Sequence, residues 1–306
     1  MAGPAARRWP EGKQFAFTIV DDTDDATLDG IRPIYDLLGE LGIRTTKTVW
    51  VLPATEDPRW RGGDTLEEPR YRDFIRGLQG SGFEIALHGV RGTSSTREII
   101  RQGLDRYVEI LGRPPRIHVN HSKNADNLYW GAARLPRWRR ALRLHGKGPA
   151  ASHGHDARSP YFWADLCRSS VDYVRGLTFS GIDTLSCDPY MPYHDDRYPL
   201  VNAWFSCSNG AEIGEFRSLL TPANLRTLVE GGGACIVYTH FGTPGFVTAK
   251  GEVADDVRAI LAGLARENGW FRPASAILDH LRGGELRRLA PFQRLRLESR
   301  ARLDRY

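Results

Sequence analysis

The chain has 306 residues, of which 41% are hydrophobic and 26% charged, and 42 basic against 37 acidic residues give a formal net charge of +5. This composition excludes a disordered, collagenous or coiled-coil protein, and no apolar run reaches the roughly 18 residues of a membrane helix. The basic N-terminus lacks a following apolar segment, so we expect no secretory signal. Four cysteines without CxxC spacing are typical of free thiols in a reducing compartment, so we expect a cytoplasmic protein.

Short apolar runs recur along the chain and predict buried β-strands. Each run is rich in β-branched or aromatic residues, and polar residues follow it. The predicted strands cover residues 15–20, 46–52, 83–87, 116–120, 201–206 and 234–238.

Helical patterns separate these runs. Ser95 and Glu98 have the spacing of a capping box, in which the Ser95 hydroxyl accepts a hydrogen bond from the Glu98 N–H. This helix should end at Gly112, and Thr221 followed by Pro222 predicts the start of another helix. The other expected helices cover residues 31–41, 253–264 and 274–281.

Alternating strands and helices predict parallel strands joined by helical crossovers. We therefore expect an α/β fold, namely a distorted (β/α) barrel with about seven parallel strands; an open doubly wound sheet is the alternative. Residues 1–13 should form an N-terminal extension, 14–283 the barrel domain and 284–306 a basic C-terminal tail. This tail is either solvated or contacts an anionic partner, and peripheral membrane contact is one such possibility.

Polar residues gather where four of the apolar runs end. Asp21 and Asp22 follow the first run, and His88, His121 and His240 follow three later runs. In parallel α/β folds the carboxyl ends of the strands carry the functional site. Carboxylate and imidazole groups together can bind a divalent metal. Adjacent strand residues point to opposite faces, so Asp21 and Asp22 can share one site only if the strand ends there.

These segments, in this order, resemble the motifs of the polysaccharide deacetylase superfamily, also called the NodB-homology domain or carbohydrate esterase family 4. The segment TIVDDT (18–23) is similar to its first motif, GFEIALH (82–88) to its second and CIVYTH (235–240) to its last. WFRPASAILDHL (270–281) is similar to its closing segment, and the resemblance covers residues 14–283.

The resemblance implies a metal-dependent deacetylase with a NodB-like barrel and zinc as the expected ion. It implies that Asp21 is the general base, Asp22 a metal ligand, His88 the first histidine ligand and His240 the general acid. A bound metal lowers the pKa of water and polarises the carbonyl under attack. The base would take a proton from the water, and the acid would protonate the departing amine.

The second motif departs from the family pattern at its second histidine. That position is Gly92 here, so the expected set of one aspartate and two histidines is incomplete. His121 is the predicted replacement, because it lies at another strand end. Strand alternation places His118 on the opposite side, whereas His153 and His155 could reach the site from an irregular segment.

Two further features of a deacetylase site are less defined in this sequence. The arginine of the third motif has no clear counterpart, and Arg91, Arg113 and Arg116 are the candidates. Trp204 and Tyr238 are the predicted substrate-binding residues, because aromatic faces can stack on sugar rings.

Together these patterns favour a deacetylase acting on an N-acetylated sugar. The expected substrate is a lipid- or nucleotide-linked precursor of a surface polysaccharide, and no nucleic acid is expected as a partner. Gly92 leaves open a catalytically inactive, NodB-like sugar-binding or scaffold protein. An unrelated barrel hydrolase that shares only the strand-end geometry is the third possibility.

Overall fold

A computed structural model describes residues 9–55, 62–131 and 152–304 of the chain. Strands and helices alternate along most of its length, as the apolar pattern predicts. In chain order the elements are η1 (Pro10–Gly12), β1 (Phe15–Asp21), α1 (Leu28–Glu40), β2 (Thr46–Val49), α2 (Pro69–Gly80), β3 (Glu84–Leu87), α3 (Arg97–Leu111), β4 (Ile117–His118), α5 (Ala164–Ser170), β5 (Tyr173–Phe179), α6 (Thr184–Cys187), β6 (Tyr193–His194), β7 (Ala203–Asn209), α7 (Ile213–Leu219), α8 (Pro222–Gly231), β8 (Ala234–Thr239), α9 (Asp255–Ala265), β9 (Gly269–Phe271), α10 (Ala274–Arg282), β10 (Arg287–Arg288) and α11 (Pro291–Leu303).

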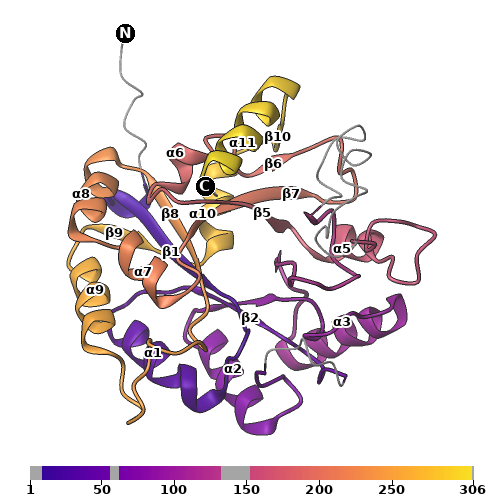
Figure 1. The fold of residues 1–306 in the computed structure, drawn as a ribbon, viewed down its shortest axis with the longest axis horizontal. Coiled ribbons are helices and arrows are strands. Elements are labelled where there is room, and N and C mark those ends of the chain that lie inside the picture. Colours follow the sequence, from indigo (N-terminus) through magenta and orange to yellow (C-terminus); the bar gives the residue numbers. More distant parts are fainter. Residues whose placement is uncertain (1–8, 56–61, 132–151, 305–306) are drawn as a thin grey trace.

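The strands of the described chain close into a parallel barrel. Their order is β7-β5-β4-β3-β2-β1-β8, and β8 pairs in turn with β7, so the seven strands form a ring. Every pairing within this ring is parallel. Helices lie around the ring, with α1 and α2 on one side and α8 and α9 on another (Figure 1). The predicted (β/α) barrel is confirmed, and the open sheet is excluded.

Six of the seven barrel strands coincide with predicted apolar runs. The seventh, β5, was not predicted, because its sequence YVRGLTF contains Arg175 and Gly176 in the middle. A charged residue and a glycine both disfavour a strand by local criteria. Packing inside the barrel outweighs this local preference, since Tyr173, Val174 and Phe179 are all buried.

Three short strands extend the barrel. β9 pairs with β1, β6 runs antiparallel to β7, and β10 pairs with β6. The strand β10 and the helix α11 lie within residues 284–306, the expected basic tail. Leu297 and Ala301 of α11 are buried, whereas Phe292 and Leu295 are exposed. The described part of this segment is therefore packed against the barrel on one face.

The starts of two helices show whether the predicted capping residues are correct. Thr221 caps α8, because its hydroxyl accepts a hydrogen bond from the Asn224 N–H at 3.3 Å, as expected. The predicted capping box is wrong: Thr96 is the N-cap of α3, and Ser95 Oγ donates to the Thr93 carbonyl instead. The Ser95 N–H is held by the buried carboxylate of Asp126, so a distant contact overrides the local cap.

The strand register brings the polar strand ends to one end of the barrel. Asp21 lies beside Thr239 of β8 and Lys47 of β2, and Leu87 of β3 lies beside His118 of β4. Residues that follow β1, β3, β4 and β8 therefore meet at the carboxyl ends of the strands. Among the helices that the structure describes, none combines the length and apolarity needed to cross a bilayer.

Candidate metal centre

One aspartate and two histidines converge at the carboxyl end of the barrel. Asp24 Oδ1 lies 3.3 Å from His88 Nε2, and Asp24 Oδ2 lies 3.4 Å from His121 Nε2. A potential ligand atom from each residue falls within 4.8 Å of the other two. The residues are only 5%, 2% and 7% exposed. Mixed oxygen and nitrogen donors of this kind are suited to zinc and similar divalent ions.

A turn after β1 determines which aspartate enters this cluster. Asp25 adopts a left-handed conformation with φ of 57°, and the Ala26 N–H donates to the Thr23 carbonyl at 3.1 Å. The chain therefore reverses directly after β1, and Asp24 turns toward the two histidines. Asp and Asn tolerate left-handed backbone better than most residues, which explains the aspartate at position 25.

Neighbouring groups orient both histidine rings. His121 Nδ1 lies 3.3 Å from the amide oxygen of Asn124, which can only accept, so the ring's Nε2 faces Asp24 without a proton in the neutral tautomer. Trp50 is fully buried and donates from Nε1 to the backbone carbonyl of His88 at 3.1 Å. Its ring lies 5.6 Å from that of His121 and forms one wall of the cluster.

The electrostatics of Asp24 and His88 suit a bound cation. Burial alone would raise the pKa of Asp24, but contacts with His121 and His88 hold it well below the ordinary range. Burial lowers the pKa of His88 and so favours the neutral imidazole that metals require. Burial would also lower the pKa of His121, but its contact with Asp24 raises that pKa as long as no cation replaces the proton. Asp24 Oδ1 is buried without a hydrogen-bond partner among the described residues. A buried acceptor in this state is costly unless a ligand satisfies it, so these residues fit a divalent metal.

Asp22 lies beside the cluster in an ion pair with Arg175. Two guanidinium nitrogens of Arg175 contact the two carboxylate oxygens of Asp22 at 2.8 and 2.6 Å, and both side chains are buried. Arg175 also stacks over the ring of Tyr238, with its Cζ 4.3 Å from the ring centroid. Burial opposes ionisation of Asp22, but the charge and hydrogen bonds of Arg175 lower its pKa. Asp22 is therefore a fixed anion beside the candidate metal cluster.

Asp21 points away from the cluster, toward the helix layer. Its carboxylate contacts Lys47 Nζ at 2.8 Å and accepts hydrogen bonds from the Tyr35 hydroxyl of α1 at 3.0 Å and the Phe241 N–H at 2.8 Å. The strand continues to Asp21, and the Asp22 N–H still donates to Thr239 of β8. Strand alternation therefore sends Asp21 and Asp22 to opposite faces.

His240 approaches the cluster from β8. Its Nδ1 donates to the Ala211 carbonyl at 2.9 Å, so Nε2 is the nitrogen that faces the site. Nε2 lies 3.9 Å from Asp22 and 4.0 Å from Asp24. A β-carbon on the nearby Gly242 would lie 2.4 Å from the Ala26 backbone nitrogen. Glycine at this position lets the loop that carries His240 approach the turn that carries Asp24.

The other predicted histidines lie outside this cluster. His118 Nε2 is 3.2 Å from Asn120 Oδ1, and its ring packs edge-on against Trp163. His155 accepts a hydrogen bond from the Tyr129 N–H and stacks on the Tyr129 ring. The backbone N–H of His153 donates to the Ala125 carbonyl.

The arginine and aromatic candidates have different positions. Arg116 binds Asp172 and Asp279 near the amino ends of the strands, and Arg91 donates to the Ser94 carbonyl. Trp204 is buried in an aromatic cluster with Tyr198 and Tyr129. Tyr238 is half-buried and lies beside His240, with ring centroids 5.1 Å apart.

Sequence reasoning missed two residues of this centre, Asp24 and Arg175. Asp24 belongs to the acidic run after the first strand, but the motif directed attention to the adjacent pair Asp21 and Asp22. Strand alternation and a turn at Asp25 could have indicated it. Arg175 lies in the strand that the apolar pattern did not detect, and no local signal identifies it as a partner of Asp22.

Comparison with known proteins finds solved structures with a similar fold but no matching sequence. No protein-family model matches the chain, and no curated protein sequence matches it. A solved structure of a polysaccharide deacetylase from Mycobacterium smegmatis, described as putative, is similar over 94% of this chain and 96% of its own, with 17% identity and a TM-score of 0.53. A Puue allantoinase is similar over 93% and 95%, with 14% identity and a TM-score of 0.53.

These likenesses extend over nearly the whole of each chain. They establish that the protein has the barrel fold found in a deacetylase of the polysaccharide type and in an allantoinase. The resemblance drawn from the sequence motifs is thus confirmed in the fold, for a divergent chain.

Proposed function

We propose that the protein is a metal-dependent hydrolase that cleaves an amide carbon–nitrogen bond in an acylated sugar. The observation that carries this proposal is the buried group of Asp24, His88 and His121, with Asp22 and His240 within 4.0 Å of it. Solved structures that share the fold include one described as a polysaccharide deacetylase and one as an allantoinase, which supports the same class of chemistry.

Asp24, His88 and His121 would hold the metal, which replaces the sequence-based assignment of Asp22 as a ligand. A divalent ion bound there would polarise the substrate carbonyl and acidify a water molecule. Asp22 would be the general base, because it lies beside the cluster and Arg175 fixes its orientation. Asp21 is less suited to that role, because Lys47 and Tyr35 engage it on the far face of β1.

His240 would protonate the departing amine. Its Nε2 faces the carboxylates of Asp22 and Asp24, while its Nδ1 is tied to the Ala211 carbonyl. That hydrogen bond fixes the ring plane and leaves one nitrogen to exchange a proton with substrate. The side chain is 7% exposed, so a reacting group would meet it out of bulk water.

The finer assignment follows from the sequence resemblance. We infer an N-acetylated sugar as substrate, carried on a lipid or a nucleotide as a precursor of a surface polysaccharide, and zinc as the metal. Half-buried Tyr238, beside His240 and Arg175, is the aromatic residue best placed to contact a sugar ring. Trp204 is less suited to contact substrate, because it is buried near the amino end of β7 against Tyr129 and Tyr198.

Single substitutions in the acidic run test these roles. We expect Asp24→Asn to lose bound metal and to lower turnover at least about 10³-fold, because it removes a charged ligand. Asp22→Asn should keep the metal and lose turnover by about 10²–10⁴-fold, as expected for a general base. Metal content is measured by mass spectrometry, and turnover as acetate released from UDP-N-acetylglucosamine and from N-acetylglucosamine oligomers.

Asp25→Asn is the matched control, because asparagine also tolerates the left-handed backbone at this position. It should keep both metal and turnover. If Asp21→Asn rather than Asp22→Asn abolished turnover with metal retained, the original base assignment would stand. Wild-type protein that binds no metal and releases no acetate after reconstitution would instead favour a sugar-binding or scaffold protein.

A further inference from the structure

A second cavity lies at the end of the barrel opposite the metal centre. It has a volume of about 390 Å³, within the range of small-molecule sites. Asp172 and Asn202 on its wall directly precede β5 and β7, so the cavity is at the amino ends of the strands. The metal cluster follows the carboxyl ends of β1, β3 and β4. Because the barrel strands are parallel, the two sites are separate.

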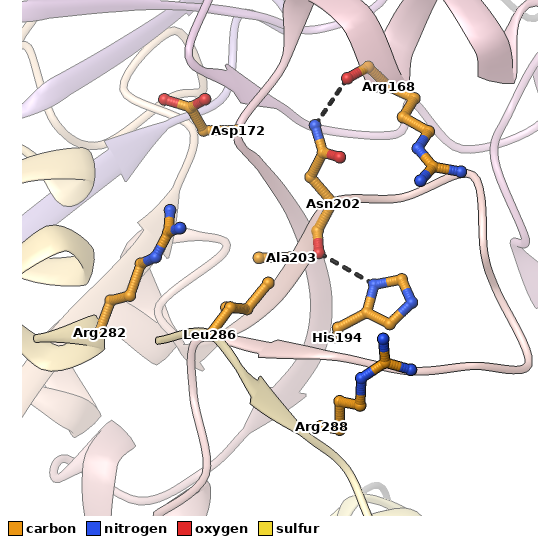
Figure 2. Close-up of a pocket in the computed structure, with 8 residues that line it drawn as sticks. All are labelled: Arg168, Asp172, His194, Asn202, Ala203, Arg282, Leu286 and Arg288. Atoms are coloured by element: carbon orange, nitrogen blue, oxygen red, sulfur yellow. Dashed lines mark hydrogen bonds between the residues drawn. The ribbon is translucent and has the colours of Figure 1, made fainter. Parts of the chain in front are cut away.

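Three arginines from distant parts of the chain line this cavity. Arg168 comes from α5, Arg282 from the end of α10 and Arg288 from β10. Figure 2 shows Arg282 on one side of Asn202, and Arg168 and His194 on the other. All three arginines are exposed, so a ligand can reach them from solvent.

Two of these arginines have no carboxylate partner among the described residues. Arg168 donates to the Pro199 carbonyl at 3.2 Å. Within residues 9–55, 62–131 and 152–304, Arg282 has no carboxylate oxygen within 4.0 Å, although it interacts with the Tyr173 hydroxyl and with the charge of Asp279. Other surface arginines are paired with a carboxylate, as in Arg97 with Asp165 and Arg272 with Glu11. Guanidinium groups that converge on a cavity without a counter-charge are suited to bind an oxyanion.

The acidic groups around the cavity are already engaged. Asp172 accepts from Arg116 Nε at 2.7 Å, and Arg116 also binds Asp279, whose charge acts on Arg282 as well. Asp196 pairs with Arg288 at 2.9 Å and lies 3.5 Å from His194. The positive charge of Arg168 and Arg282 is therefore the part that remains available to a ligand.

We propose that this cavity binds a phosphate or diphosphate group, held by the guanidinium groups of Arg168 and Arg282 with Arg288 and Asn202 beside them. The planar N–H pairs of arginine match phosphate oxygens in two-point contacts. The ligand would be a phosphorylated compound distinct from the group hydrolysed at the metal centre, because the two sites occupy opposite ends of the barrel.

The phosphate could come from a soluble compound or from a lipid headgroup. The helix α11 begins three residues after Arg288 and exposes Phe292 and Leu295, so a lipid surface could reach this side of the molecule. Both sources present the same oxyanion, and binding experiments with soluble and vesicle-borne phosphate distinguish them.

The test is calorimetric titration of the full-length protein with inorganic pyrophosphate. We expect the double substitution Arg168→Gln with Arg282→Gln to weaken binding at least about tenfold, since two charge-assisted contacts are lost. Arg296→Gln is the matched control, because this exposed arginine on α11 does not line the cavity, and it should bind as wild type. Asp24→Asn should also bind as wild type, which separates this site from the metal centre.

A parallel flotation assay uses vesicles of phosphatidylcholine with and without phosphatidylglycerol. If vesicle binding requires Arg168 and Arg282 but not Arg296, the ligand is a lipid headgroup. If pyrophosphate binding requires these two arginines and the vesicles do not bind, the ligand is a soluble compound. The proposal fails if neither ligand depends on the two arginines, or if Asp24→Asn abolishes pyrophosphate binding. Replacing both arginines by lysine keeps their positive charge. This variant should therefore retain part of the pyrophosphate binding even if the glutamine variant folds poorly.

Discussion

The two ends of the barrel bury carboxyl groups in different surroundings. At the amino end, Glu84 of β3 accepts hydrogen bonds from the Thr46 hydroxyl at 2.7 Å and the Ser275 N–H at 3.2 Å. At the carboxyl end, Asp22 meets a guanidinium, and Asp24 meets two imidazoles. Burial raises the pKa of Glu84, whereas the cationic and imidazole partners lower the pKa of Asp22 and of Asp24 despite burial.

The difference shows that the partners of a buried acid determine its charge. Neutral donors leave Glu84 inclined to stay protonated, so it links β3 to β2 and α10 as a polar contact of the core. Charged partners keep Asp22 and Asp24 ionised, which is the form needed for metal binding and proton transfer. A buried ion pair contributes little net stability, so its presence at one end is a sign of function.

The largest expected effect comes from removing the cation at the carboxyl end. Arg175→Met should lower the free energy of unfolding by about 3–5 kcal/mol, because Asp22 is left as a buried, unpaired charge. Urea denaturation measures this change. Adding Asp22→Asn to Arg175→Met should recover part of the loss, because the uncompensated charge is removed.

A simple additive loss in that double variant would contradict the comparison. It would mean that Asp22 and Arg175 contribute independently to stability. Arg116→Met serves as a control at the other end of the barrel. Its carboxylate partners Asp172 and Asp279 are about half exposed, so water can replace the lost contacts and the effect should be smaller.

An intermediate effect on stability and turnover is expected from a substitution that forces apart the loop carrying His240 and the turn carrying Asp24. Gly242→Ala would place a β-carbon 2.4 Å from the Ala26 nitrogen, so the backbone must shift. We expect a loss of about 1–3 kcal/mol in unfolding free energy, together with reduced turnover, because His240 moves relative to Asp24.

Gly77→Ala is its matched control, because a β-carbon there meets nothing within 4 Å in the helix α2. It should be neutral or stabilising by up to about 1 kcal/mol, since alanine favours a helix over glycine. Full turnover in Gly242→Ala would show that the loop spacing matters less than we infer. Thermal denaturation and acetate release give the two readouts.

The smallest effect is expected at the amino end. Glu84→Gln keeps an oxygen acceptor and removes a carboxyl whose raised pKa favours protonation in the folded state. The unfolded chain releases that proton near pH 4.5, so wild-type stability should fall, relative to the variant, as the pH rises above this value. At pH 7 the variant should equal or exceed the wild type by about 1 kcal/mol.

Urea denaturation from pH 4 to pH 8 measures this dependence. Glu230→Gln, at an exposed position on α8, should show no such trend. A wild type that gains stability over the variant with rising pH would reverse the sign assigned to Glu84. The two ends of the barrel would then no longer differ in the way described.

Much of the fold could be predicted from the sequence. Six strands follow apolar runs, because burial on both faces requires nearly continuous apolar residues. β5 was not predicted, because Arg175 interrupts its apolar pattern. Asp22, the partner that compensates the charge of Arg175, lies 153 residues away in the chain. Local patterns carry no information about such a partner, so the strand and the arginine that pairs with Asp22 were missed together.

By itself, the sequence determined which segments supply polar groups to one end of a parallel barrel. This was possible because the strands can be recognised from their apolar runs, and the polar residues follow those runs directly. It also indicated His88, His121 and His240, which the structure brings near one another. Only the tertiary structure decided that Asp24 joins the histidines, that Asp22 pairs with Arg175 and that Asp21 faces Lys47. The reason is geometric: strand alternation and one left-handed turn direct three nearby carboxylates differently, and each partner comes from another strand.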